Sequence, residues 1–133
     1  MAAIIDTSVL VAAERGALDL DALLRSRPDE EVMLAAITAS ELLHGVHRMK
    51  GAVARAHAHV FVDRLLNVLP VLPFDLEVAR VHALLSAELS SRGTPIGAHD
   101  LLIAATAVHA GAAVATRDRR SFPRIRGLRI DSW

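Results

Sequence analysis

Four acidic side chains occupy similar points of the sequence, each just after an apolar stretch or in the expected first turn of a helix. They are Asp6, Glu41, Asp100 and Asp118. Carboxylate oxygens are hard ligands, which favour Mg²⁺ or Mn²⁺ over softer metal ions. If the fold gathers these anions in one cleft, their mutual repulsion requires a cation. A divalent ion in such a cleft would serve metal-assisted hydrolysis of a phosphodiester bond.

Each acid also has a purely structural interpretation. Asp6 is able to cap the helix that follows it, and Asp100 suits the positive end of a helix dipole. Glu41 ends the segment Thr38-Ala39-Ser40-Glu41, which has the form of a capping box. Asp118 could close an Asx turn. These roles explain one acid at a time, but they do not explain why four acids stand at equivalent junctions.

Strands and helices that alternate along the chain would position these acids. Short apolar runs predict buried strands at 4–5, 32–35 and 113–115, and edge strands at 69–73 and 128–130. Helical spacing of apolar residues predicts helices at 9–13, 18–24, 38–49, 53–67, 75–91 and 101–109. The alternation predicts a single α/β domain, residues 1–133, with a largely parallel sheet. The acids would then meet at the carboxyl ends of its strands, where ligands bind.

The composition limits the kind of site that this chain can form. Of its 133 residues 53% are hydrophobic and 23% charged, which is typical of a folded globular domain. The chain has no cysteine, which excludes disulfides, zinc–thiolate sites and thiol catalysis. Its longest uncharged run, 101–115, is shorter than the roughly 18 residues that span a bilayer, and no signal peptide is recognisable. We therefore expect a soluble cytoplasmic protein.

The order and spacing of four segments resemble those of the PIN-domain ribonucleases, and within them the VapC toxins of bacterial toxin–antitoxin pairs. The segments are Ile4-Ile5-Asp6-Thr7-Ser8, Thr38-Ala39-Ser40-Glu41-Leu42, His99-Asp100-Leu101-Leu102-Ile103-Ala104-Ala105 and Thr116-Arg117-Asp118. Together they extend over nearly the whole chain. The resemblance implies a three-layer α/β/α sandwich with a central, largely parallel sheet and a magnesium- or manganese-dependent endoribonuclease site.

The resemblance also implies roles for individual residues. Asp6, Glu41 and Asp100 resemble the principal metal ligands, and Asp118 resembles the fourth acid, the least constant of the family's set. Two hydroxyl residues resemble those that support the acids by hydrogen bonds, with Thr7 steadying Asp6 and Thr116 beside the late acid. The expected partners are a second copy of the chain and a VapB-type antitoxin whose basic side chain enters the acidic pocket.

Basic residues near the acids are candidates for binding RNA. His99 adjoins Asp100 and could touch a phosphate, and Arg117, Arg119 and Arg120 could pair with phosphate oxygens. The arginine-rich segment could instead be a solvated edge that discourages strand pairing. Because aromatic residues make up only 3% of the chain, we expect recognition of backbone charge and shape rather than base stacking.

The helices expected at 38–49 and 53–67 carry more apolar positions than one sheet face readily covers. This surplus predicts that they help to form an antitoxin groove, a homodimer contact, or both. Packing within the core would explain many of the same residues.

Two other functions fit part of the pattern. A non-catalytic RNA-binding PIN module would keep the acids without cleaving RNA. An acid-pocket phosphotransfer domain would also place an aspartate after the first strand. A receiver of that kind needs a lysine after a late strand, and the only lysine is Lys50, between two expected helices. A phosphatase of the haloacid dehalogenase type needs a second aspartate where Ser8 stands.

Overall fold

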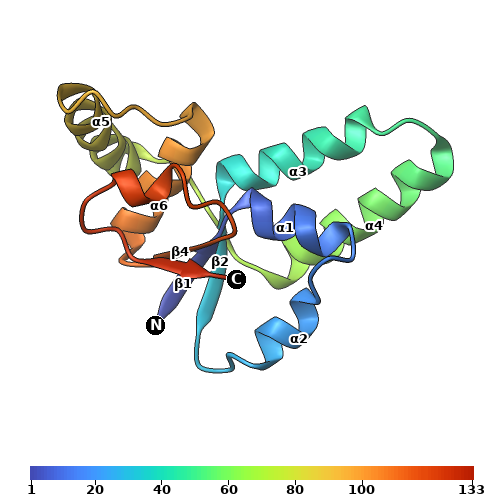
Figure 1. Cartoon of the computed structure of the whole chain (residues 1–133). Coiled ribbons are helices and arrows are strands. Elements are labelled where there is room, and N and C mark those ends of the chain that lie inside the picture. Colours follow the sequence, from blue (N-terminus) through green and yellow to red (C-terminus); the bar gives the residue numbers. More distant parts are fainter.

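A parallel five-stranded sheet forms the centre of the molecule (Figure 1), and the computed structural model describes all 133 residues of the chain. The strand order is β3-β2-β1-β4-β5, and each neighbouring pair runs parallel. The strands are β1 (Ala2–Ile5), β2 (Glu31–Ala35), β3 (Val71–Leu72), β4 (Ala113–Thr116) and β5 (Ile130–Ser132). The predicted α/β class with a parallel sheet is therefore confirmed.

Six α-helices and one short 3-10 helix connect the strands. They are α1 (Thr7–Glu14), α2 (Leu20–Arg25), α3 (Ala36–Arg48), α4 (Ala52–Val68), α5 (Leu76–Ser91), α6 (Ala98–Ala110) and the 3-10 helix Phe122–Arg124. Helices α3 and α4 form a long hairpin that extends away from the sheet (Figure 1). None of the helices is long and apolar enough to cross a membrane.

Alternating residues of the strands feed two separate cores, one on each side of the sheet. Ile5 and Leu34 belong to a core completed by α1, α2, α3 and α4. Ile4 and Met33 point to the other face, where α5 and α6 pack together with Phe122. Because neighbouring side chains of a strand point to opposite faces, both sides must be covered, which produces the three layers.

The chain adds β2 and β3 on one side of β1, and then crosses back to add β4 and β5 on the other side. The backbone N–H of Asp6 donates to the carbonyl of Ala115 at 3.0 Å, which continues the pairing of β1 with β4 by one residue. In open parallel sheets such a reversal leaves a crevice at the carboxyl ends of the strands. Asp6 therefore stands at the point of the sheet where a ligand site is expected.

Two predicted local features were wrong, and one feature of the structure was not predicted. The capping box at Thr38–Glu41 does not form, because α3 begins at Ala36 and places Thr38, fully buried, inside the helix. The last strand lies at 130–132 rather than 128–130. The 3-10 helix that buries Phe122 was not predicted, because three residues are too few to show periodicity.

Candidate active site

Asp6 is the most firmly held of the four acids. The residue is only 4% exposed, and its carboxylate accepts hydrogen bonds from the Ser8 backbone N–H at 2.5 Å and the Ser8 hydroxyl at 2.6 Å. The Thr116 hydroxyl donates to its other oxygen at 2.6 Å. A buried carboxylate that accepts this many hydrogen bonds is held in one orientation. Asp6 also caps α1, so its structural role and its place in the site coexist.

Glu41 reaches the same region from α3. Its Oε1 accepts a hydrogen bond from the Thr7 hydroxyl at 3.1 Å, and its Oε2 lies 3.5 Å from His99 Nδ1. Because α3 begins earlier than the sequence indicated, Glu41 lies a full turn inside the helix and its carboxylate is free to face α1 and α6. Thr7 therefore supports Glu41, whereas we had expected it to steady Asp6.

Asp100 lies half-buried in the first turn of α6. Burial is the largest effect on its carboxyl and raises its pKa, because the charged form is poorly solvated there. A hydrogen bond from the Ser121 side chain acts in the opposite direction. The negative charges of the other three acids raise the pKa further, and the net shift is upward. These acids are Asp6, Asp118 and Glu41.

Asp118 lies in the turn after β4. Its Oδ1 accepts a hydrogen bond from the Arg120 backbone N–H at 2.9 Å, which closes the predicted Asx turn. That bond is the largest of the effects that hold the pKa of Asp118 below its ordinary value, and the Arg120 side chain, 3.3 Å away, adds to it. The Asp118 backbone N–H donates to the Thr116 hydroxyl at 2.9 Å, so Thr116 joins the turn to Asp6.

The structure thus brings all four predicted acids to one end of the sheet, where each of the other three acts electrostatically on Asp100. As the side chains stand, no group of three Asp, Glu or His residues is placed to coordinate one ion. The donor set nevertheless fits a hard divalent cation, because it consists of carboxylates whose repulsion a cation would relieve. The side chains of Glu41 and Asp118 are each 27% exposed, which leaves them room to turn toward an ion.

The predicted RNA-contacting residues include two that lie against the acids, His99 beside Glu41 and Arg120 beside Asp118. His99 has a side chain that is 57% exposed beside Glu41. Arg117 and Arg119 have exposed side chains, and that of Arg120 is 89% exposed although it pairs with Asp118. All four residues are therefore accessible to a polyanion that approaches the acids.

Two supporting residues, Ser8 and Ser121, were not predicted. Ser8 donates to Asp6 and its hydroxyl oxygen accepts the backbone N–H of Arg117 at 3.0 Å, so it connects the ends of β1 and β4. Its position two residues after Asp6, where a capping aspartate bonds the backbone, was a usable signal. Ser121 acts on Asp100 across 21 positions of sequence, and nothing in the local pattern indicates that contact.

Replacing Thr116 by valine should lower RNA cleavage about 10- to 100-fold, the range for outer partners of metal ligands. The change removes the hydroxyl that bonds Asp6 and accepts from Asp118, and unpaired buried groups cost about 1–3 kcal/mol of stability. Thr106→Val is the matched control, because its equally buried hydroxyl bonds only the Leu102 carbonyl within α6. Equal activity of the two variants would contradict the supporting role of Thr116.

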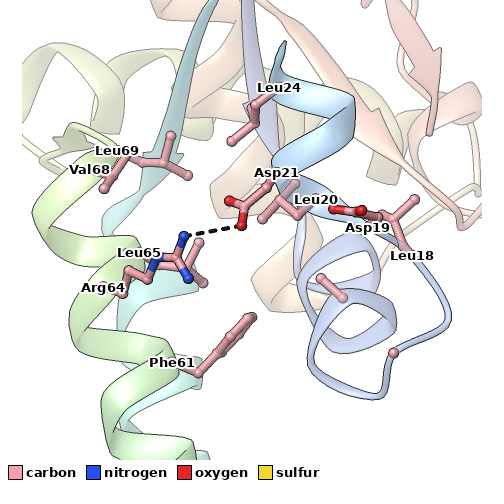
Figure 2. A pocket seen from close by; sticks show the side chains of 12 residues that line it. Leu18, Asp19, Leu20, Asp21, Leu24, Phe61, Arg64, Leu65, Val68 and Leu69 are labelled. Atoms are coloured by element: carbon pink, nitrogen blue, oxygen red, sulfur yellow. Dashed lines mark hydrogen bonds and ion pairs between the residues drawn. The ribbon is translucent and has the colours of Figure 1, made fainter. Parts of the chain in front are cut away.

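The surface carries two hollows that bear on the site, of which only one adjoins the acids. The hollow beside them has Thr7 and Glu41 in its wall and extends between α1 and α3 to Met49 and Val62. A second, mostly apolar groove of about 360 Å³ lies farther away, between α2 and α4 (Figure 2). The side chains of Leu20 and Leu24 face Phe61, Leu65 and Val68 across it, and Arg64 bonds Asp21 at its rim at 3.1 Å. The apolar groove is therefore separate from the acids.

Comparison with known proteins places these features in a family context. The family model of the PIN domain matches residues 3–128 of the chain. "Ribonuclease VapC" of Rickettsia bellii is 33% identical over 130 residues, which cover 98% of this chain and 95% of that protein. "tRNA(fMet)-specific endonuclease VapC" of Salmonella typhimurium is 34% identical over 100 residues, or 75% of this chain and 74% of that one.

A solved structure shares the whole fold. The DNA-bound VapBC complex from Salmonella typhimurium contains a chain that superposes with a TM-score of 0.90 at 27% sequence identity. The superposition covers 100% of this chain and 98% of that one. The similarity therefore includes both the sheet edge that carries the acids and the helices on either side.

Proposed function

The chain belongs to the PIN-domain family, and from this premise we propose that it is the ribonuclease toxin of a toxin–antitoxin pair, with residues 1–133 forming one domain. Its relatives are ribonucleases and endonucleases by name, and one of them is specific for tRNA(fMet). The observation that carries the proposal is the meeting of Asp6, Glu41, Asp100 and Asp118 at the carboxyl end of the sheet. A substrate of this kind is met in the cytoplasm, which is the compartment we propose for the chain.

The acids would hold one or two divalent ions, which we propose to be Mg²⁺ or Mn²⁺. Asp6 would be the fixed ligand, because three donors hold its carboxylate in place. Glu41 and Asp100 would complete the principal set, and Asp118, already bonded to Arg120, would be the fourth. A bound ion supplies a water of lowered pKa and offsets charge on the phosphate. No side chain with a pKa near neutrality is then needed as a general base.

Basic side chains at the rim would hold the RNA in position. The exposed guanidinium groups of Arg117, Arg119 and Arg120 match phosphate oxygens in charge and geometry. His99 would approach a phosphate next to Glu41, from which its Nδ1 is 3.5 Å distant. Binding through the phosphates would weaken as the salt concentration rises.

Regulated expression in a bacterial host tests the proposed function. We expect growth to stop on induction and a defined RNA, with tRNA(fMet) as the first to examine, to be cut. The antitoxin would be sought in a small reading frame immediately upstream of the gene, and its co-expression should restore growth. Stable RNA in arrested cells, with the chain bound to it, would favour a non-catalytic RNA-binding module. An acyl phosphate formed on Asp6 from a small phosphodonor would favour a phosphotransfer domain.

The apolar groove between α2 and α4 is the proposed seat of the antitoxin. Its apolar walls suit one face of an amphipathic helix, and its open rim carries the Arg64–Asp21 pair. Helices α1 and α4 contribute to this groove and to the hollow at Glu41, so a segment leaving the groove could continue toward the acids. A basic side chain of the antitoxin would there meet the carboxylates. Of the two helices predicted to form this surface, only α4 lines the groove.

Replacing Val68 by aspartate should weaken antitoxin binding by at least about 10-fold, because a charge would enter the apolar wall. Val68 is 65% exposed, so the fold should tolerate the change. Val60→Asp is the matched control, since Val60 is 66% exposed on the same helix but does not line the groove. Titration calorimetry with the antitoxin measures both. Equal affinity of the two variants would exclude this groove.

A second copy of the chain is the other proposed partner. Leu43 and Val71 line one shallow hollow, and Phe74 lines the neighbouring one, which shares Ala36 and Ser40 with it. These three large apolar residues are 37%, 40% and 45% exposed, respectively. Contiguous exposed apolar residues favour a protein contact. Light scattering should show a dimer of the purified chain, and a monomer at all concentrations would contradict this proposal.

A further inference from the structure

Strand β5 is the edge strand beside the site and has backbone partners on one side only. Ser132 is paired with Thr116, and the Trp133 backbone N–H donates to the Thr116 carbonyl at 3.3 Å. A three-residue strand at an edge has few bonds to keep it in place, so its end opens readily without other contacts. Whatever holds the end of β5 therefore also holds the carbonyl of Thr116.

Arg27, in the turn between α2 and β2, makes those other contacts. Its Nη1 lies 2.8 Å from Asp131 Oδ2 and 3.1 Å from Glu30 Oε2. Its guanidinium carbon lies 4.8 Å from the centre of the Trp133 ring, within the range of a cation–π contact. The Trp133 ring in turn donates from Nε1 to Asp131 Oδ2 at 2.9 Å. We call Arg27, Asp131 and Trp133 the β5 clamp.

The clamp is shielded enough for its contacts to be effective. The side chains of Arg27 and Asp131 are 30% and 33% exposed, and that of Glu30 only 13%. Trp133 packs against the core that also contains Ile5 and Ala115. A network of this kind is worth more than the isolated surface ion pair, which contributes little.

Thr116 connects the clamp to the acids. Its carbonyl accepts from Trp133, while its hydroxyl donates to Asp6 at 2.6 Å and accepts from the Asp118 backbone N–H at 2.9 Å. Thr116 is 1% exposed, so its position follows the strand that carries it. A shift of β4 at this residue would therefore change the orientation of the Asp6 carboxylate.

We propose that the β5 clamp is a positioning device for Asp6, which acts through Thr116 on RNA cleavage. The proposal rests on the proposed function of the acids as a ribonuclease site. Arg27 bonds none of the four acids of the site, and it acts across 104 positions of sequence through its bond to Asp131.

Replacing Arg27 by alanine should lower kcat for RNA about 10-fold, the lower end of the range for outer partners of metal ligands, and leave KM unchanged. The same substitution should raise the Mn²⁺ concentration that gives half-maximal activity. Arg27→Lys keeps the charge near Asp131 but not the planar group over Trp133, so it should recover part of the loss. Arg80→Ala is the matched control, because it removes an exposed ion pair with Glu77 on α5.

A loss of stability alone must be separated from a loss of positioning. Val78→Ala removes methyl groups from the core beneath α5 and should lower Tm without lowering kcat. Hydrogen exchange provides a second readout that needs no activity. Arg27→Ala should speed exchange of the amides at 5–9 and 114–118, whereas those of α5 should stay as in the unmodified chain.

The outcomes distinguish this proposal from the proposed function. If the unmodified chain fails to cleave RNA, the proposed function is wrong, and the exchange data still decide whether the clamp holds the Asp6 segment. If Arg27→Ala lowers Tm as Val78→Ala does but leaves kcat, the Mn²⁺ response and exchange at 5–9 unaltered, the clamp is only structural and the proposal is overturned.

Discussion

Asp6→Asn should reduce RNA cleavage by more than about 100-fold while the chain stays folded. Losing a group that hydrogen-bonds a metal ligand lowers activity by up to about 100-fold, and removing the charge of the ligand itself should lower it more. Asparagine keeps one oxygen to accept from the N–H and hydroxyl of Ser8. Its amide group can donate to Thr116, whose hydroxyl can turn to the Asp118 carbonyl 3.3 Å away. The hydrogen-bond network around residue 6 therefore survives.

Asp75→Asn is the matched control for this variant. Asp75 caps α5 by accepting from the Val78 backbone N–H, as Asp6 caps α1, but it is not among the acids whose charges act on Asp100. Asparagine and aspartate cap helices about equally well, so both variants should unfold near the temperature of the unmodified chain. Full activity of Asp6→Asn would show that Asp6 is a helix cap only.

Asp100→Asn should also abolish cleavage, yet make the metal-free chain more stable. Burial and the charges of three neighbouring acids raise the pKa of Asp100 in the folded protein above its ordinary value of 3.8. The folded state then binds this proton more tightly than the unfolded state. Stability therefore falls as the pH rises from the pKa of Asp100 in the unfolded chain through its higher pKa in the folded chain. At neutral pH the ionised carboxylate destabilises the fold, and the neutral amide removes that cost.

Thermal unfolding in EDTA at pH 4 and pH 7 measures this effect. The Tm advantage of Asp100→Asn should be larger at pH 7, where the carboxylate is ionised in the unmodified chain. Glu77→Gln is the matched control, because Glu77 is the first-turn acid of α5, pairs with Arg80, and is not among the acids that act on Asp100. There the helix dipole favours the charge, so the amide should lower Tm slightly. A lower Tm for Asp100→Asn would show that its carboxylate stabilises the fold.

The sequence could predict the sheet and the junctions at which Asp6, Asp100 and Asp118 stand, because those signals are local. The apolar run before Asp6 and the polar turn after it lie within eight residues and correspond to β1 and the start of α1. Asp75 and Gly111 likewise mark helix ends by their own chemistry, a capping carboxylate and a left-handed backbone with φ of 66°.

The start of α3 shows where local chemistry misleads. Thr38-Ala39-Ser40-Glu41 satisfies the capping-box pattern, but the helix begins directly after β2, at Ala36, without any side-chain cap. Burying Leu42 and Val46 outweighs the lost cap, since each buried apolar side chain contributes more than a capping bond. The early start of the helix also buries Thr38. The Thr38 hydroxyl has no hydrogen-bond partner as a result. The same shift frees Glu41 for the site.

The supporting shell of the site could not be predicted, because its contacts join distant parts of the chain. Thr116 meets Asp6 across 110 positions, and Ser8 meets the Arg117 backbone across 109. A serine or threonine in a turn has no periodicity that would indicate its partner. The contacts become visible only once β1 and β4 lie side by side.

Cleavage of RNA by the purified chain, freed of antitoxin, is the most direct test of the metal-dependent site. The chain should cut RNA in Mg²⁺ or Mn²⁺, lose that activity in EDTA, and regain it when either ion is restored in excess. Asp6→Asn should stay inactive under all these conditions. Cleavage that persists undiminished in EDTA, or RNA that is bound but never cut with either ion, would contradict a metal-dependent ribonuclease site.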